Sequence, residues 1–206
     1  MEKHHKFFQE IPKGFPPSRD HEYQIELIPR STPPNKRPYS YPRHQKGEIE
    51  KSVQDMLDAS IIQQTKSSFS TPVVMVRIKD NSWRMCPDCR YLNKITIKDK
   101  LPIPNIDELL NELHGVAYFT KLDMKSGYHQ IILRKEDIPK IAFRTRDKKY
   151  EILVMPFWLT NVPSTFQSLM KKKIQPHLKK FVLVFFDDIL FIANHGKNIL
   201  NMSIKS

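Results

Sequence analysis

The chain has 206 residues, and its 34 Lys and Arg against 22 Asp and Glu give a formal net charge of +12. This positive charge favours nucleic acid as a partner, although a basic protein without such a partner would show the same balance. This length corresponds to one large or two small domains with a sizeable core, which excludes disorder throughout. The apolar runs fall far short of the ~20 residues that a membrane span needs, and no signal-peptide pattern is present, so we expect an intracellular protein without a membrane partner.

The N-terminal region is rich in proline. Half of the 16 prolines lie in the first 42 residues, where each removes a backbone donor and favours extended structure. Residues 1–42 are therefore predicted to form an extended arm, with one strand at 23–28. After Gly47, apolar residues at helical spacing predict an amphipathic helix of about three turns, with Ile49, Val53, Met56 and Leu57 on its apolar side.

The region from 43 to 193 is predicted to be the folded body. Segments 72–79 and 83–90 flank turn residues and predict a hairpin. Asn105 and Glu108 have the spacing of a helix N-terminus, and Pro163 can open a further helix at its first turn. The remaining predicted strands are 117–123, 130–133, 141–146, 150–157, 181–186 and 189–193. Residues 194–206 are predicted to form a tail.

Three carboxylates stand at the ends of apolar segments. Asp187 and Asp188 lie between FVLVFF and ILFIA, and Asp123 ends AYFTKLD. An unpaired buried carboxylate is costly, so two adjacent ones indicate a tight turn with divalent cations nearby. Three such groups could hold two metal ions that stabilise the attacking and leaving oxygens of a phosphoryl transfer. The alternative is that each Asp caps a strand or a turn.

Ordered motifs run from about Phe15 to Ala193, among them KGEIEKSVQDML, SSFSTPVVMVRIKD, LNKITIKDKLPIPNIDELL, LDMKSGYHQI, LVMPF and FFDDIL. On these motifs the chain resembles the reverse transcriptase of long-terminal-repeat retrotransposons of the Ty3/Gypsy type. The resemblance implies an α+β fold of fingers and palm, with an antiparallel palm sheet and supporting helices. It also implies RNA-directed DNA polymerase activity with two Mg²⁺ ions, deoxynucleoside triphosphates and an RNA or DNA template-primer, in cytoplasmic particles or the nucleus.

The resemblance assigns roles to individual residues. The family's catalytic, metal-binding aspartates match Asp123, Asp187 and Asp188, of which the last is the weaker partner. The basic fingers residues that cradle the incoming triphosphate match Lys79 and Arg84, and the planar fork of Arg suits bidentate phosphate contacts.

Two aromatic residues match positions beside the incoming sugar. Tyr128 matches the residue beneath the sugar, where bulk can reject a 2′-hydroxyl, and Phe157 matches the position that flanks it. Without the resemblance, both would be interpreted as ordinary core aromatics.

Other features are less specific. A group of lysines flanks the last predicted helix and could contact a nucleic-acid backbone or form a solvated face: Lys171, Lys172, Lys173, Lys179 and Lys180. Cys86 and Cys89 have the spacing of half a zinc site, but a structural zinc needs four ligands and the chain has no second Cys pair.

The chain departs from the family at several positions where glycine is usual: Ser60, Asn81, Trp158, and Lys148 or its neighbour. Asn tolerates left-handed turns. Trp158 is predicted to crowd the substrate, so that the chain is inactive or very weak and Trp158→Gly recovers some activity once a thumb is supplied by fusion to a related enzyme.

The chain stops soon after FFDD, so we expect no thumb and a truncated, partly degenerate copy. A catalytically inactive nucleic-acid-binding remnant is the alternative function. A metal-dependent nuclease using the same three Asp is disfavoured, because the chain also carries candidate nucleotide-binding residues. The sequence leaves the oligomeric state open.

Overall fold

The computed structural model describes residues 14–17, 21–100, 107, 111, 113–123, 127–175, 182–185 and 188–193. These residues belong to two compact units, which we describe separately. Unit 1 comprises Met1–Ile97 and Tyr128–Thr160, and unit 2 comprises Lys98–Gly127 and Asn161–Ser206. None of the helices in the described ranges is long and apolar enough to cross a membrane. The division into an arm, a body and a tail stays a prediction.

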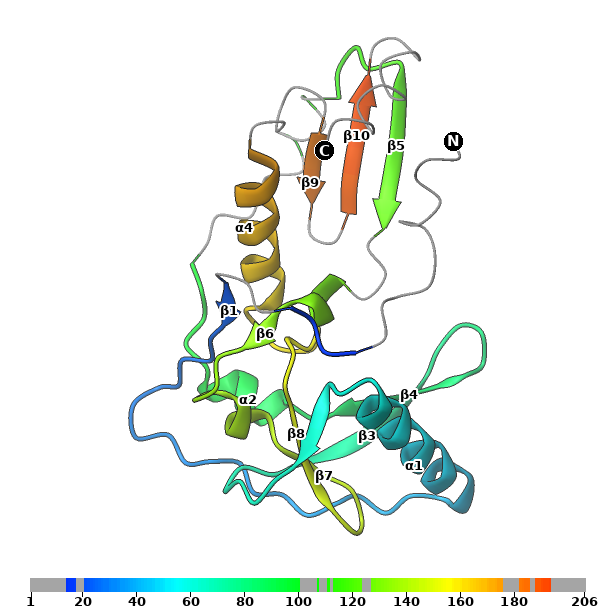
Figure 1. Ribbon diagram of the computed structural model, residues 1–206, viewed down its shortest axis with the longest axis vertical. Coiled ribbons are helices and arrows are strands. Elements are labelled where there is room, and N and C mark those ends of the chain that lie inside the picture. The colour runs from blue at the N-terminus through cyan, green and yellow to red at the C-terminus, as the bar shows by residue number, and fades with distance from the viewer. Residues whose placement is uncertain are drawn as a thin grey trace. The chain divides into compact units, whose positions relative to one another are not determined.

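Unit 1 is built on a five-stranded mixed sheet in the order β2-β8-β7-β3-β4 (Figure 1). β3 and β7 pair in parallel, and the other neighbours pair antiparallel. The predicted hairpin is confirmed as β3 and β4, with Val73 opposite Pro87. The strands are β2 (Ile62–Gln64), β3 (Thr71–Arg77), β4 (Trp83–Pro87), β7 (Phe143–Arg144) and β8 (Lys149–Ile152).

A second, two-stranded sheet in unit 1 ties the N-terminal region to the rest of the unit. β1 (Glu22–Tyr23) pairs in parallel with β6 (Ile132–Leu133). The strand predicted at 23–28 is therefore shorter than expected. Beyond β1, the backbone N–H of Ile25 donates to the carboxylate of the buried Asp137 at 2.9 Å. This side-chain acceptor replaces the backbone carbonyl that a neighbouring strand would supply.

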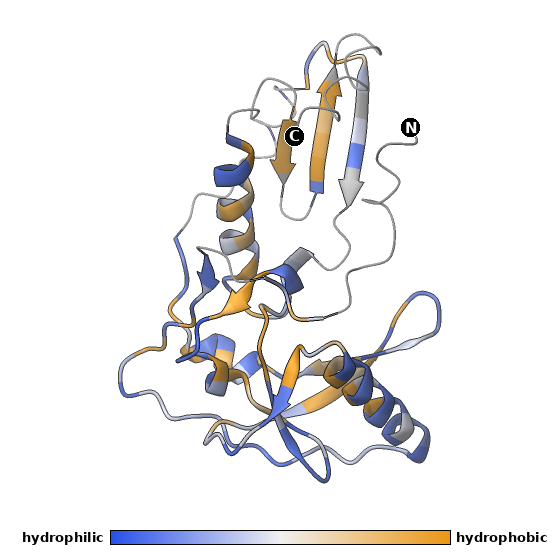
Figure 2. Cartoon of the chain, in the orientation of Figure 1, coloured by the Kyte–Doolittle hydropathy of each residue, from blue (hydrophilic) through white to orange (hydrophobic). Residues whose placement is uncertain are grey.

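The first predicted helix is confirmed as α1 (Arg43–Asp58), which begins before Gly47. Its buried residues are Ile49 and Val53, whereas Met56 and Leu57, the other two residues of the predicted apolar side, are half-buried. Unit 1 also contains α2 (Arg90–Ile95), the 3₁₀ helix η3 (Ile138–Ile141) and, from Tyr128 on, the 3₁₀ helix η2 (Gly127–Gln130). Figure 2 shows hydrophilic residues along most of α1, consistent with one buried stripe.

Unit 2 contains a three-stranded antiparallel sheet in the order β5-β10-β9. The strands are β5 (Tyr118–Asp123), β9 (Val182–Phe185) and β10 (Asp188–Ala193), and the helix is α4 (Val162–Ile174). Val182, Val184 and Ile189 form a buried cluster on which Met170 and Ile174 of α4 pack. The helix opened by Pro163 is thus confirmed, whereas the predicted helix start at Asn105 and Glu108 lies outside the described residues.

Candidate functional site

The strand register of unit 2 places two of the three predicted aspartates opposite each other. Asp188, the first residue of β10, pairs with Asp123, the last residue of β5. Residues paired across an antiparallel ladder lie on the same face of a sheet. Side chains alternate along a strand, so Ile189 packs on the face that α4 covers and position 188 belongs to the other face. Asp187 lies outside the described residues.

The carboxylate of Asp188 has a cation beside it. Lys121 Nζ lies 2.8 Å from Asp188 Oδ2, with 58% of the Lys121 side chain and 42% of the Asp188 side chain exposed. Lys121 comes from β5, two residues before position 123. Among the described residues, no three His, Cys, Asp or Glu side chains converge as a metal site would require. The exposed carboxylate is accessible to a second cation from solvent.

The predicted triphosphate-binding residues lie on the β3–β4 hairpin of unit 1. Lys79 is exposed in the turn, and Arg84 is exposed on β4 opposite Val76. The turn closes through a hydrogen bond from the Ile78 N–H to the Ser82 carbonyl at 3.0 Å, and Asn81 has a positive φ of 65°. Asn therefore occupies a left-handed conformation that glycine would adopt without strain, as the sequence predicts.

Arg84 and Phe157 are in contact. The Arg84 Cζ atom lies 5.7 Å from the centroid of the Phe157 ring, within the range of a cation–π interaction. Phe157 is 41% exposed, and its ring meets the ring of Trp158 edge-on, with centroids 4.8 Å apart and an interplanar angle of 73°. One triphosphate candidate and one sugar candidate are thus brought together within unit 1.

Tyr128 is half-buried in the 3₁₀ helix η2, where the Ile131 N–H donates to its carbonyl at 3.2 Å. Burial lowers the pKa of the neighbouring His129, so this imidazole favours its neutral form. The role of Tyr128 beside a sugar stays a prediction.

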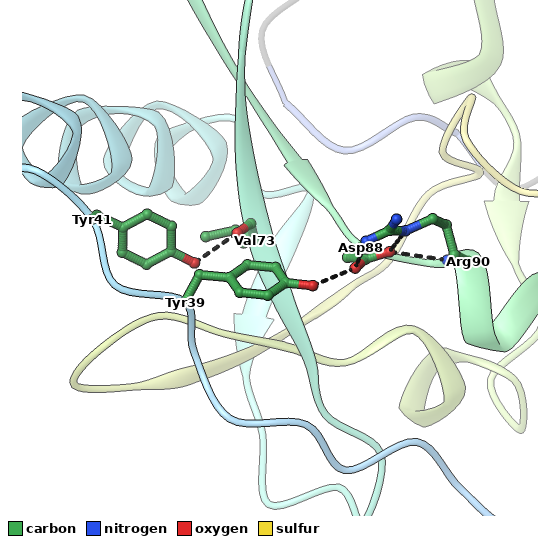
Figure 3. A network of polar contacts seen from close by, with 5 residues as sticks. All are labelled: Tyr39, Tyr41, Val73, Asp88 and Arg90. Atoms are coloured by element: carbon green, nitrogen blue, oxygen red, sulfur yellow. Dashed lines mark hydrogen bonds and ion pairs between the residues drawn. The ribbon is translucent and has the colours of Figure 1, made fainter.

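A polar network that the sequence analysis missed joins the N-terminal region to the end of the hairpin (Figure 3). The Tyr39 hydroxyl donates to Asp88 Oδ2 at 2.8 Å, and Arg90 donates to both carboxylate oxygens of Asp88, each at 2.8 Å. The Tyr41 hydroxyl donates to the Val73 carbonyl at 2.6 Å. The hydrogen bonds of Arg90 and Tyr39 hold the pKa of Asp88 well below its usual range.

The two cysteines of the zinc-like pair are free thiols. Cys89 is buried, and burial raises its pKa to about 12. The Trp158 Nε1 atom is also buried and has no hydrogen-bond partner among the residues that the structure describes. Of the predicted lysine group, Lys171, Lys172 and Lys173 form the last turn of α4, and the other two lie outside the described residues.

Sequence comparisons identify the family. Residues 76–205, more than half of the chain, match the family model described as reverse transcriptase (RNA-dependent DNA polymerase), so the chain belongs to this family. It is 47% identical over 118 residues to an RNA-directed DNA polymerase homolog of Oenothera berteroana, covering 57% of this chain and 83% of that protein.

Further relatives are retrotransposon polyproteins. The Pol polyprotein from the Drosophila melanogaster transposon opus is 38% identical over 170 residues, covering 78% of this chain. The transposon Tf2-3 polyprotein of Schizosaccharomyces pombe is 32% identical over 190 residues, covering 92%. The chain spans only 17% and 14% of these two polyproteins. The predicted origin in a retrotransposon of the Ty3/Gypsy type is therefore confirmed.

The fold comparison agrees with the family. A structure of a foamy viral protease-reverse transcriptase in complex with an RNA/DNA hybrid has a TM-score of 0.84 with 20% sequence identity, and the match covers 98% of this chain and 27% of that one. The predicted reverse-transcriptase-like α+β fold, with an antiparallel sheet and a supporting helix in unit 2, is confirmed.

Proposed function

We propose that this chain provides the fingers and palm of an RNA-directed DNA polymerase, which transfers nucleotides from deoxynucleoside triphosphates to a primer 3′-OH. The single observation that carries the proposal is the register of β10 on β5, in which Asp188 pairs with Asp123. Family membership supports it, because these two positions fall in the motifs LDMKSGYHQI and FFDDIL.

The donors at this edge of the sheet fit Mg²⁺. Carboxylate oxygens are the ligands that Mg²⁺ prefers, and the Asp188 carboxylate is partly exposed and has one cation, Lys121 Nζ, at 2.8 Å. We assign Asp123 and Asp187 to hold two ions between them, with Asp188 as the weaker ligand. Two bound ions supply electrostatic stabilisation of the attacking and leaving oxygens.

In unit 1, we assign Arg84 and Lys79 to the triphosphate of the incoming nucleotide. Both are exposed, and the guanidinium of Arg84 offers a planar set of donors that matches phosphate oxygens. We assign Phe157 and Tyr128 to the sugar. The contact between Arg84 and Phe157 supports a common substrate for these two residues, since triphosphate and sugar belong to one nucleotide.

An RNA or DNA template-primer is the proposed polymeric substrate. The formal net charge of +12 supports it, because Lys and Arg that neutralise phosphates release condensed counterions. Two similar structures are described as complexes of foamy viral protease-reverse transcriptase with an RNA/DNA hybrid and with double-stranded DNA. The origin in a retrotransposon supports a location in cytoplasmic particles or the nucleus.

Primer extension tests the proposal. The purified chain is incubated with a labelled primer on RNA or DNA templates, the four deoxynucleoside triphosphates and Mg²⁺. We expect template-dependent extension that Asp187→Asn abolishes, while Asp147→Asn, at an exposed position in unit 1, leaves it unchanged. Extension no greater than that of Asp187→Asn would show that this chain is not an active polymerase.

A further inference from the structure

Trp158 lies in a turn that α2 fixes from one side. The Asn93 side-chain amide donates to the Trp158 carbonyl at 3.0 Å and accepts from the Thr160 N–H at 3.1 Å. The indole Nε1 is buried, and it lies next to the small, buried side chain of Cys89, the N-cap residue of α2. The described non-glycine residues with positive φ do not include Trp158, so the backbone here does not require glycine. The turn therefore holds the indole ring in a defined place.

The ring of Trp158 in turn supports Phe157. The edge-on contact, with centroids 4.8 Å apart, is the geometry that aromatic pairs prefer. Phe157 is 41% exposed, so solvent would otherwise leave its ring free to change rotamer. The contact with Trp158 restricts this freedom on one side.

The Phe157 ring in turn restricts the side chain of Arg84. The guanidinium carbon lies 5.7 Å from the ring centroid, and within the part of the chain that the structure describes no ion pair or hydrogen bond holds the guanidinium. A long, exposed Arg side chain loses much rotamer entropy when it binds a phosphate. A ring that already orients the guanidinium lowers that loss before the ligand arrives.

We propose that Trp158 is a positioning residue, which holds the Phe157 ring so that Arg84 presents its guanidinium to the triphosphate of the incoming nucleotide. This inference depends on the phosphate-binding role proposed for Arg84. It is opposite to the sequence-based prediction that Trp158 crowds the substrate. The two hypotheses predict opposite effects of removing the indole. If Trp158 positions Arg84, its removal should weaken triphosphate binding, and if Trp158 obstructs the substrate, its removal should improve activity.

Binding of inorganic tripolyphosphate to the full chain, measured by isothermal titration calorimetry at physiological salt, tests the proposal without requiring polymerase activity. Arg84→Gln reports the phosphate contact itself. Arg77→Gln is the matched control, because it removes the same charge from an exposed position on the same hairpin. Trp158→Leu removes the aromatic edge but keeps apolar volume, and Trp158→Phe keeps an aromatic ring. Circular dichroism confirms that each variant is folded.

We expect Arg84→Gln to weaken binding much more than Arg77→Gln. Trp158→Leu should weaken binding by roughly 2- to 10-fold, the range that corresponds to one aromatic pair, and Trp158→Phe should recover part of the loss. In a Phe157→Leu background, Trp158→Leu should cause no further loss, because its effect passes through Phe157.

Wild-type affinity in Trp158→Leu, together with weak binding in Arg84→Gln, would overturn the positioning role and leave the role of Arg84 intact. An equal loss from Trp158→Leu with and without Phe157 would also overturn it. If Arg84→Gln behaves like Arg77→Gln, Arg84 does not bind the triphosphate, and both the assignment of Arg84 and the positioning role are wrong.

Discussion

The buried carboxylate of Asp88 links the N-terminal region to the β3–β4 hairpin, and we expect it to contribute measurably to the stability of the fold. Its side chain is 3% exposed, and it accepts hydrogen bonds from the Tyr39 hydroxyl and from Arg90. Tyr39 comes from a part of the chain 49 residues away, so this acceptor ties the N-terminal region to the hairpin (Figure 3). Asp88→Asn keeps the size of the side chain and replaces one acceptor oxygen by a donor.

The expected loss from Asp88→Asn is about 2 kcal/mol. A hydrogen bond to a charged acceptor contributes roughly 1.5–3 kcal/mol, and the lower part of this range applies because Tyr39 is 42% exposed. The side chain of Arg90 is 79% exposed and its ion pair with Asp88 is screened by solvent, so this pair adds little stability. For a chain of this length, ~2 kcal/mol corresponds to a decrease in Tm of about 4–8 °C.

The pH dependence of this difference follows from the lowered pKa of Asp88. A carboxyl whose pKa is lower in the folded than in the unfolded state stabilises the fold fully above the unfolded pKa of about 3.9, and this contribution is lost as the pH falls towards the folded pKa. Wild type and Asp88→Asn should therefore differ by a constant amount near neutral pH and should converge as the pH falls below about 4.

Urea unfolding at a series of pH values measures both effects. Asp80→Asn is the control, since Asp80 is exposed on the same hairpin and accepts from the Ser82 N–H at 2.9 Å, a bond that Asn can also accept. Equal changes in stability for the two variants, or a difference for Asp88→Asn that does not shrink in acid, would refute the reasoning.

Three further outcomes follow from the structure. Ser60→Gly should stabilise the fold by roughly 0.5–1 kcal/mol in thermal unfolding, because Ser60 has φ 57° at the end of α1, whereas Ala59→Gly, at φ −77°, should destabilise it. Cys89 should react with a thiol reagent more slowly than the half-buried Cys86, since burial raises its pKa to about 12; equal rates in the folded chain would contradict this. Affinity for a labelled primer-template should fall steeply with salt and depend little on sequence, and an affinity that hardly changes with salt would exclude binding driven by phosphate contacts.

Local sequence patterns predicted the elements whose contacts are close in the chain. The spacing of Ile49 and Val53 gave the buried side of α1, and the turn residues gave the β3–β4 hairpin. The apolar pattern after Gly47 predicts a later start of α1 than the structure shows, because Gly47 lies inside the helix. Glycine inside a helix costs only about 1 kcal/mol, which the packing of α1 tolerates.

Strand lengths depended on partners that the sequence does not reveal. The apolar run at 150–157 was predicted as one strand, but β8 ends at Ile152 and the chain changes partner. Val154 bridges to Ile132, and the Met155 N–H donates to the Ile131 carbonyl at 2.8 Å. Burial continues through this change, so an apolar run cannot show where one sheet ends.

The family's glycine positions were predicted correctly in part. Ser60 and Asn81 have positive φ, as a usual glycine position suggests, whereas Trp158 and Lys148 are not among the described residues with positive φ. Resemblance alone therefore does not show at which of these positions the backbone conformation favours glycine and at which it does not. The network of Tyr39, Asp88 and Arg90 gave no sequence signal, because its partners are distant and ordinary in type.

Divalent-cation binding by the β5–β10 carboxylates most directly tests whether this sheet edge is the metal centre of a polymerase. Mn²⁺ can replace Mg²⁺ in a titration followed by electron paramagnetic resonance of the free ion. We expect saturable binding that Asp123→Asn and Asp187→Asn each weaken strongly, that Asp188→Asn weakens less, and that Asp147→Asn leaves unchanged. Binding that is the same in wild type, Asp123→Asn and Asp187→Asn would contradict a metal site at this edge.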